Sequence, residues 1–406
     1  MATRFRLPPL DVPMAAAALG LIAVGLSTVF SATTVPGAHE GLWVKQLVWF
    51  GLAFCAAWVA VAIHYRAYES LAYLLYVVSL LLLIAVLLVG SSAMGAKRWL
   101  EFGPLKFQPS EIAKIATVFV LARRLEAPKL DLSRFRYWFP PLLVVLVPLA
   151  LVAKEPDLGT SLAFPVILVA MYYWAGMRIG QLMLGLSPVL NVALFFLTGS
   201  LWWFGVVFLG MLAAIRPKLS SLLLILAING TVAYTVPQLW DHLHDYQKRR
   251  IQTFLNPGQD PYGAGYQIIQ SRIAIGSGGM AGKGYLRGTQ KGLSFLPMRH
   301  TDFIYSVVGE ELGFLGALTV VIMYAVVILR GYRLALLARN GFASLMAVGL
   351  VSGLCYHVMV NILMTIGWAP VTGLPLPLLS YGGTALIVNC VQLGLLQNVA
   401  LRRQEY

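Results

Sequence analysis

Long apolar runs dominate the chain, and short polar connections separate them. A helix needs about 20 apolar residues to cross the ~30 Å hydrocarbon core of a bilayer. Several runs meet that length or come close to it: 14–34, 43–63, 68–90, 108–125, 139–155, 158–176, 303–329, 342–366 and 378–401. The pattern therefore predicts an all-α polytopic membrane protein built as a helical bundle.

Residues 181–236 are also apolar, but their pattern is less regular. Breaks at Gly199–Ser200 and at Pro217–Lys218 divide this stretch into three short spans, although one long span followed by a re-entrant hairpin fits as well. Both interpretations stay open. They give a bundle of ten to twelve transmembrane helices, of which we prefer twelve, with an extra helix pair at 181–216.

The composition agrees with a membrane protein and excludes an ordinary soluble domain. Hydrophobic residues make up 59% of the 406 residues and charged residues only 11%, whereas soluble domains carry about 25% charged residues. The net charge of +14 would suggest nucleic acid in a soluble protein, but short cytoplasmic loops of membrane proteins retain Lys and Arg. Many basic residues fall on one side of the predicted bundle, which we expect to be cytoplasmic together with both chain ends: Arg4, Arg6, Arg66, Arg123, Arg124, Lys129, Arg134, Arg136, Arg178, Arg216, Lys218, Arg330, Arg333, Arg339, Arg402 and Arg403.

One long segment does not span the membrane, and the parity of the spans places it outside the cytoplasm. The chain thus divides into membrane helices at 1–236, a large extracytoplasmic loop at 237–302 and three C-terminal membrane helices at 303–406. The loop holds eight Lys or Arg against four Asp, and ten glycines lie between 256 and 292. Positive charge outside opposes the usual bias, so we expect an anionic ligand there. The glycines permit close approach of backbone to a ligand, but tight turns would explain them equally well.

A few ionisable residues lie in or beside the spans, where such residues are costly and mark functional sites. Glu111 and Lys114 stand three residues apart on one helical face and can pair, either as a structural bridge or as part of a polar cavity. The other ionisable residues are expected at the extracytoplasmic face of the bundle, beside Trp99 and the glycine-rich loop: Lys97, Arg98, Lys154, Glu155, Asp157, Glu310 and Glu311. Lys97 and Arg98 also suit an interfacial anchor. The convergence of these residues predicts a site next to the glycine-rich loop.

Five long motifs carry a resemblance to a known family. They are GAKRWLEFGPLKFQPSEIAK at 95–114, EPDLGTSL at 155–162, DPYGAGYQIIQSRIAIGSGGMAGKGYLRGTQ at 260–290, LPMRHTDFIYSVVGEELG at 296–313 and GLPLPLLSYGGTALI at 373–387. In this order they resemble the SEDS family (shape, elongation, division and sporulation). GTQ at 288–290 and the SYGGT stretch resemble its elongation branch, the RodA proteins, more than its division branch.

This resemblance implies a peptidoglycan glycosyltransferase that polymerises lipid II during cell elongation. It implies a multi-pass protein of the bacterial plasma (inner) membrane with its active site on the extracytoplasmic side. The implied partners are lipid II, a class B penicillin-binding protein transpeptidase and the elongation machinery, with no nucleic acid. The chain departs from the family's ten-helix plan at 181–216, and an added helix pair preserves parity, so the expected side of the loop is unchanged.

The resemblance also implies roles for individual residues. The family's essential loop aspartate matches Asp260, which we expect to act as general base in an inverting transfer with a polyprenyl pyrophosphate leaving group. Without the resemblance, Asp260 followed by Pro261 is ordinary turn chemistry. Basic side chains suit pyrophosphate, and the expected substrate-binding set is Lys97, Arg98, Trp99, Glu111, Lys114, Arg272, Lys283, Gln290, His300, Asp302 and Ser380. No cluster with ligand spacing specifies a metal, although a divalent cation could neutralise the pyrophosphate.

Two other functions stay open from the residues. A lipid II flippase is also a multi-span bundle with charges at mid-depth, but alternating access predicts a site near the midplane, where Glu111 and Lys114 are the candidates. A non-catalytic scaffold for a transpeptidase predicts that substitutions of Asp260 leave cell-wall synthesis unaffected. The concentration of acidic and basic groups on the outer side favours the enzyme.

Overall fold

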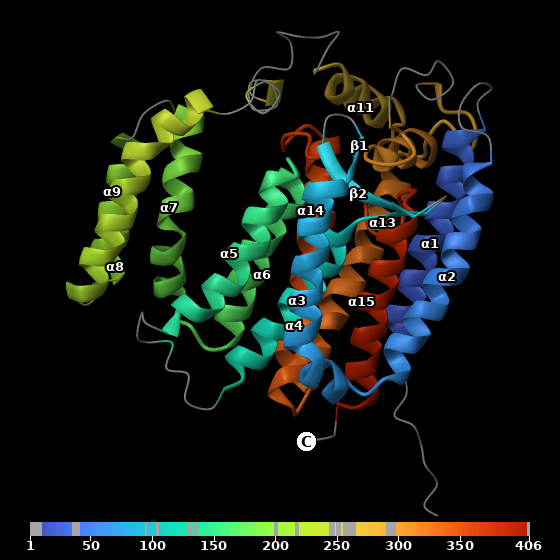
Figure 1. The fold of residues 1–406 in the computed structure, drawn as a ribbon. Helices are drawn as coiled ribbons and strands as arrows, with labels where there is room; N and C mark the ends of the chain where they lie inside the picture. Colours follow the sequence, from blue (N-terminus) through green and yellow to red (C-terminus); the bar gives the residue numbers. More distant parts are fainter. Residues whose placement is uncertain are drawn as a thin grey trace, which may run out of the picture.

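The computed structural model describes residues 10–34, 41–93, 96–102, 105–127, 132, 137–198, 202–215, 219–242, 248, 253–254, 265–289 and 298–403. Within these ranges the fold is helical (Figure 1), which confirms the predicted polytopic helical bundle. Six of the described helices are long and apolar enough to cross a membrane: α1 (Val12–Thr33), α2 (Leu42–Ala62), α3 (Tyr65–Val89), α13 (Ile304–Leu337), α14 (Gly341–Thr365) and α15 (Gly383–Leu401).

Helices α14 and α15 form the centre of the bundle. Their apolar stretches are 67% and 72% buried, against 17% for α2 and 22% for α3, which lie at its periphery. Three shorter helices, α4 (Pro109–Leu125), α5 (Phe139–Lys154) and α6 (Leu158–Trp174), complete this part, and both α4 and α6 pack on α14. Because lipid tails are as apolar as a protein core, hydropathy alone does not separate central from peripheral helices.

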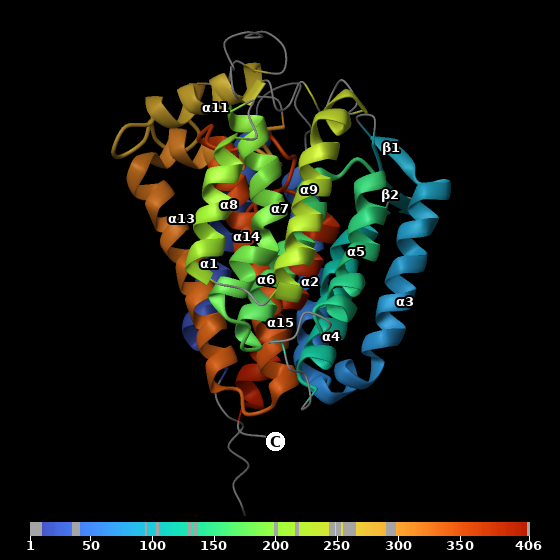
Figure 2. The same cartoon turned by 90° about the vertical axis from the view of Figure 1, so that its left-hand side faces the viewer.

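Three helices occupy the apolar stretch whose pattern the sequence left ambiguous. They are α7 (Ile179–Thr198), α8 (Trp202–Ile215) and α9 (Leu219–His242), and they stand side by side at one edge of the bundle (Figures 1 and 2). They have a small core of their own, formed by Leu184, Phe208 and Ile225. Asn229 Nδ2 on α9 also donates to Ser187 Oγ on α7 at 2.8 Å. This edge of the molecule is therefore a distinct packing unit that meets the bundle through α6.

A small antiparallel sheet follows α3, where the hydropathy pattern predicted no strands. Its strands are β1 (Ser91–Ala93), β2 (Ala96–Phe102) and β3 (Leu105–Phe107), in the order β1-β2-β3. Across the β2–β3 pair, Lys106 Nζ lies 2.8 Å from Glu101 Oε1, and the hydrogen bond to Lys106 is the main cause that lowers the pKa of Glu101. A search for apolar runs misses these strands because residues 96–102 mix charged and aromatic side chains. The sheet holds Arg98 at one end of the bundle, the end at which α3 stops and α4 begins.

The segment 278–284 is joined by its backbone to a break in α13. At Gly313 the helix has φ 66° and ψ −164°, which are not helical values. The amides of Phe314 and Leu315 donate to the carbonyls of Gly279 and Met280 at 2.8 and 3.2 Å. This segment follows α11 (Tyr266–Ser277), which lies across the same end of the bundle as the sheet, at the top of Figure 1. Here the glycines permit close packing of backbone against backbone, whereas the sequence had suggested either close approach to a ligand or tight turns.

Candidate active site

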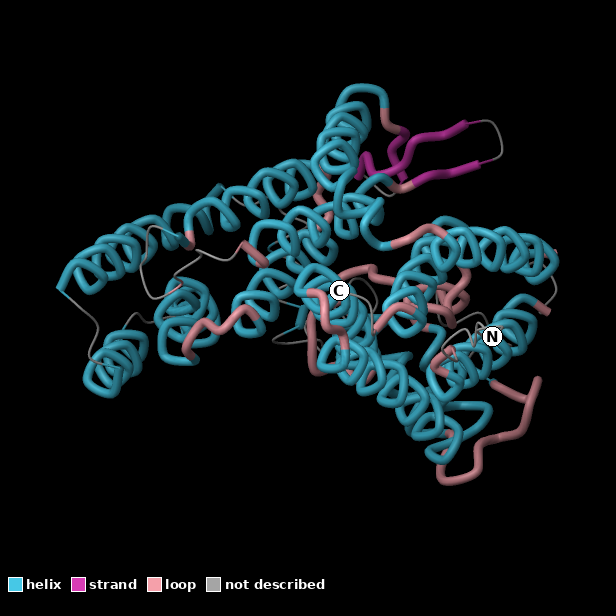
Figure 3. The backbone as a smooth tube through the Cα atoms, turned by 90° about the horizontal axis from the view of Figure 1, so that it is seen from below, coloured by secondary structure: helices cyan, strands magenta, loops and turns pink. Residues whose placement is uncertain are grey.

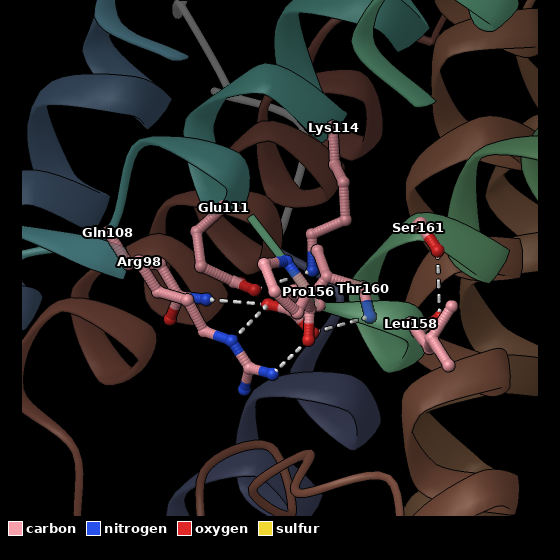
Figure 4. Close-up of polar contacts among 9 residues, drawn as sticks. Arg98, Gln108, Glu111, Lys114, Pro156, Leu158, Thr160 and Ser161 are labelled. Carbon is pink, nitrogen blue, oxygen red and sulfur yellow. Dashed lines mark hydrogen bonds and ion pairs between the residues drawn. The ribbon is translucent and has the colours of Figure 1, made fainter. Parts of the chain in front are cut away.

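A group of polar side chains comes together where β2, the start of α4 and the start of α6 meet (Figure 4). Asp157 is buried at its centre and caps α6, with Oδ1 accepting from the Thr160 amide at 3.2 Å. Its Oδ2 accepts from Gln108 Nε2 at 3.2 Å and lies 4.0 Å from Arg98 Nε. Arg98 also donates to the carbonyl of Pro156. The charge of Asp157 is therefore balanced by protein groups, as a buried carboxylate requires.

Glu155 lies beside this group, in the connection between α5 and α6. Its side chain is fully buried, and in the part of the chain that the structure describes neither carboxyl oxygen has a hydrogen-bond partner. Burial is the main cause that raises its pKa to about 8; the negative charge of Asp157 adds to the rise, and Arg98 opposes it. At neutral pH the Glu155 carboxyl is therefore mostly protonated and neutral.

Lys114 on α4 forms the second polar centre. Its Nζ donates to Glu111 Oε1 at 2.8 Å and lies 2.8 Å from Nε2 of His357 on α14, and all three side chains are buried. An ammonium group has only donors, so His357 must accept through Nε2 and carry its proton on Nδ1. Asn389 and Gln392 line a cavity of about 10 Å³ next to Lys114, which is room for about one water molecule.

Hydrogen bonds join the motif at 296–313 to the motif at 373–387. Ser380 Oγ donates to the carbonyl of Thr301 at 2.6 Å, and the Tyr381 amide donates to the carbonyl of His300 at 2.9 Å. The rings of His300 and Tyr381 meet edge to face, with centroids 5.9 Å apart. The Ser380 hydroxyl thus links the two motifs and helps to fix their relative positions.

The segment around Asp302 connects this pair of motifs to the first turn of α6. Asn361 Nδ2 donates to the carbonyls of Asp302 and Leu374 at 2.9 and 2.7 Å. A Cβ placed at Gly373 would lie 3.6 Å from Asp302 Oδ2, and one at Gly159 would lie 2.8 Å from the Leu374 side chain. The segment 373–374 therefore contacts Asp302 on one side and the first turn of α6, which Asp157 caps, on the other. Asp302 is thus close to the polar side chains around Asp157.

A third pair of contacts fixes the loop after α11 to the bundle. Lys283 Nζ lies 2.7 Å from Glu310 Oε1, and Ser31 Oγ on α1 donates to Glu311 Oε1 at 2.7 Å. A Cβ at Gly288 would lie 2.9 Å from Glu310 Oε2 and 3.2 Å from Glu311 Oε1. These two buried carboxylates therefore hold the loop, and Gly288 lets it approach them.

Comparison with known proteins identifies the family. The family model described as "Cell cycle protein", for FtsW, RodA and SpoVE, matches residues 9–203 and 189–405. The chain belongs to the FtsW/RodA/SpoVE family. It is 38% identical to peptidoglycan glycosyltransferase MrdB of Escherichia coli K12, over 97% of this chain and 94% of that protein. It is 35% identical to the probable peptidoglycan glycosyltransferase FtsW of Geobacter metallireducens, over 97% and 95%.

Solved structures of this family share the fold. A chain from a peptidoglycan synthase complex that coordinates polymerization and crosslinking matches with a TM-score of 0.73 at 30% identity, over 98% of this chain and 99% of that one. RodA of Thermus thermophilus matches with a TM-score of 0.66 at 26% identity, over 98% of both chains. The resemblance inferred from the five motifs is thereby confirmed.

Within this FtsW/RodA/SpoVE fold, the predicted cations differ in how they are paired. Arg98, Lys114 and Lys283 each face a carboxylate. Arg272 is exposed on α11 and has no hydrogen bond or ion pair within the described residues. Lys97 lies on β2 with Trp99, but its side chain is not among those described. Arg272 is thus the described candidate whose charge is free for an anionic ligand.

Two predicted residues, Asp260 and Gln290, lie outside the described residues, so their roles stay predictions. Among the residues that are described, no group of three His, Cys, Asp or Glu side chains is placed to hold a metal ion. Sequence reasoning missed His357, Gln108 and Asn361. His357 did give a signal, because an ionisable residue within an apolar span marks a functional site; the two amides gave none.

Proposed function

We propose that this protein is a peptidoglycan glycosyltransferase that polymerises lipid II at the outer face of the bacterial plasma membrane. The observation that carries the proposal is the convergence of the family motifs on one polar site, in a chain that matches MrdB over 97% of its length. The site joins the Asp157 group, the Lys114 group and the segment around Asp302 at one end of the bundle. Lipid II places a charged pyrophosphate at the membrane surface, which suits a site of this kind.

The transfer would join the glycan of one lipid II to the 4-hydroxyl of the next, with inversion at the sugar. The incoming hydroxyl needs a general base, and the departing pyrophosphate needs positive charge. Asp260 is the proposed base. Arg272 is the proposed pyrophosphate ligand because its guanidinium is exposed and unpaired among the described residues, while Arg98 and Lys114 keep the walls of the site charged and ordered.

Polymerisation of purified lipid II by the Asp260→Asn protein, with a class B penicillin-binding protein as partner, tests the assignment. We expect glycan synthesis to be lost while folding and partner binding are retained. Asp245→Asn makes the same change of charge in the same loop and should polymerise like the wild type. Wild-type glycan synthesis by Asp260→Asn would contradict the assignment of Asp260 as the base and would favour a non-catalytic scaffold. In the same assay, inhibition by a chelator would reveal a need for a divalent cation.

The Lys114 site weighs against the flippase. A carrier needs a substrate site near the midplane, but the cavity beside Lys114 and His357 has a volume of about 10 Å³, far too small for a lipid-linked sugar. Translocation of dye-labelled lipid II in proteoliposomes, without glycan synthesis, would support the carrier instead.

A further inference from the structure

The chain enters α1 and leaves α15 at the other end of the bundle, the end from which Figure 3 views the molecule. A second cavity lies there. Its volume is about 230 Å³, and its walls include Leu10, Asp11, Val12, Arg330 and Arg403. The charge pattern of the sequence predicts that this end is cytoplasmic. None of these residues belongs to the proposed active site.

A rigid frame of hydrogen bonds forms one wall of this cavity. Asp11 caps α1 by accepting from the Met14 amide at 3.1 Å. The Asp11 amide donates to Gln397 Oε1 at 2.8 Å, and Gln397 Nε2 returns a bond to the Asp11 carbonyl at 3.0 Å. Arg330 binds the carboxylate with two nitrogens, at 3.0 Å from Oδ1 and 2.6 Å from Oδ2. The Asp11 charge is therefore buried and balanced.

Arg403 gives the cavity a net positive charge, because the charges of Asp11 and Arg330 cancel. Its carbonyl accepts from the Arg339 amide at 3.3 Å, but within the described residues its guanidinium has no hydrogen bond or ion pair. The neighbouring Arg402 differs, because it donates to the carbonyls of Val61 and Ala62 at 3.0 and 3.1 Å. With Arg330 neutralised by Asp11, the charge of Arg403 is left for a ligand.

Exposed apolar side chains accompany the charged lining of the cavity. Val12, which lines it, is 65% exposed, and Leu329, the neighbour of Arg330 in the sequence of α13, is 68% exposed. In a membrane such side chains face lipid tails. The cavity thus combines a guanidinium that has no partner within the described residues with exposed apolar side chains, and basic pockets between helices on the cytoplasmic side of a membrane bind anionic headgroups.

We propose that this cavity binds the phosphate of an anionic phospholipid in the adjacent leaflet, with Arg403 as the main ligand and Arg330 beside it. Its volume lies below the roughly 300–1,000 Å³ of sites that enclose small molecules. It therefore admits a headgroup while the acyl chains stay in the bilayer against Val12 and Leu329. Such a lipid would tie the start of α1 to the ends of α13 and α15.

Native mass spectrometry of the full-length protein in detergent, titrated with phosphatidylglycerol, tests the proposal. We expect phosphatidylglycerol to bind more tightly than phosphatidylcholine with the same acyl chains. Arg403→Gln should weaken phosphatidylglycerol binding by about fivefold, the usual effect of one basic side chain near a lipid surface. Arg403→Lys, which keeps the charge, should bind more tightly than Arg403→Gln. The control is Arg333→Gln, which removes an exposed charge one turn from Arg330 but outside the cavity.

Three results would overturn the proposal. Equal binding of phosphatidylglycerol and phosphatidylcholine would show that the net negative charge of the headgroup does not contribute to binding. Equal weakening by Arg333→Gln and Arg403→Gln would show diffuse attraction to the surface. Displacement of phosphatidylglycerol by inorganic phosphate at similar concentration would identify a site for free phosphate. The readout is lipid binding, so it does not depend on the proposed enzymatic activity.

Discussion

Glu155 shows how burial sets the chemistry of a single residue in the candidate active site. Its folded pKa is about 8, against 4.5 for an unperturbed Glu side chain. A group whose pKa is raised on folding stabilises the folded state fully below the unfolded pKa and loses that contribution as the pH rises through the folded pKa. The protein should therefore lose stability between about pH 4.5 and 8, when unfolding releases a proton from Glu155.

The substitution Glu155→Gln should remove this loss, since the amide stays neutral at every pH. We expect its thermal midpoint to exceed that of the wild type at pH 8.5, and the difference to shrink toward pH 5. Thermal unfolding in detergent, followed by tryptophan fluorescence across this pH range, measures the effect. Glu101→Gln is the control, because Glu101 is exposed and its pKa is lowered. Identical pH dependence in the wild type and Glu155→Gln would contradict the buried neutral acid.

His357 leads to a second prediction at the residue scale. It supplies the acceptor for the buried Lys114 ammonium at 2.8 Å. His357→Leu leaves that donor unsatisfied and should lower the free energy of unfolding by about 1–3 kcal/mol. His357→Gln, whose amide oxygen can accept, should retain most of the stability. Equal thermal midpoints for the Leu and Gln variants, measured in the same detergent, would show that the hydrogen bond contributes nothing.

At this scale the sequence identified the Glu111–Lys114 pair but not its third member. The pair could be predicted because the two residues lie three apart on one helix face. His357 lies 243 positions from Lys114, and no local pattern reports a contact between α4 and α14. The bond from Ser380 to Thr301 was not predicted for the same reason, because it depends on how two distant segments meet. The substrate role of Ser380 stays a prediction.

At the scale of elements, the junction between segment 278–284 and α13 depends on glycine. A Cβ at Gly282, where φ is +82°, would lie 2.1 Å from the carbonyl oxygen of Glu311. Gly279 has φ +57° but nothing within 4 Å of its Cβ position. Gly282→Ala therefore adds a steric clash to an unfavourable φ, whereas Gly279→Ala adds only the unfavourable φ, which costs about 1–2 kcal/mol.

Gly282→Ala should separate the segment from α13, and Gly279→Ala should not. Hydrogen exchange is a direct measurement, because the amides of Lys283 and Gly284 donate to the carbonyls of Glu310 and Glu311 at 3.0 and 3.1 Å. We expect these amides to exchange much faster in Gly282→Ala and near the wild-type rate in Gly279→Ala. Similar acceleration in both variants would mean that the positive φ matters and the close approach does not.

The sequence predicted the helices well but not the features between them. Apolar runs of about 20 residues fixed α1 to α3 and α13 to α15 closely, because hydrophobic length is a local property. The break at Gly313 was not predicted, since a single glycine in an apolar run leaves its hydropathy unchanged. The β2–β3 pair was missed because a search for apolar runs does not detect strands such as 96–102, which mix charged and aromatic side chains.

For the whole molecule, the distribution of charge predicts which end faces the cytoplasm. Lys106 on β3 and Arg333 on α13 lie at opposite ends of the bundle, and both side chains are exposed. Because short cytoplasmic loops retain Lys and Arg, the end with Arg333 should be inside. The end with Lys106, and with it the loop that contains Asp260, should be outside.

Cysteine labelling tests this orientation. In a background where Cys55, Cys355 and Cys390 are replaced by Ser, a membrane-impermeant maleimide should label Lys106→Cys in intact spheroplasts but label Arg333→Cys only after permeabilisation. The cysteine-free background should stay unlabelled, and both variants should react once the membrane is opened. The reverse pattern would place Asp260 on the cytoplasmic side, away from translocated lipid II, and would contradict polymerisation at the outer face even if the polar site is intact.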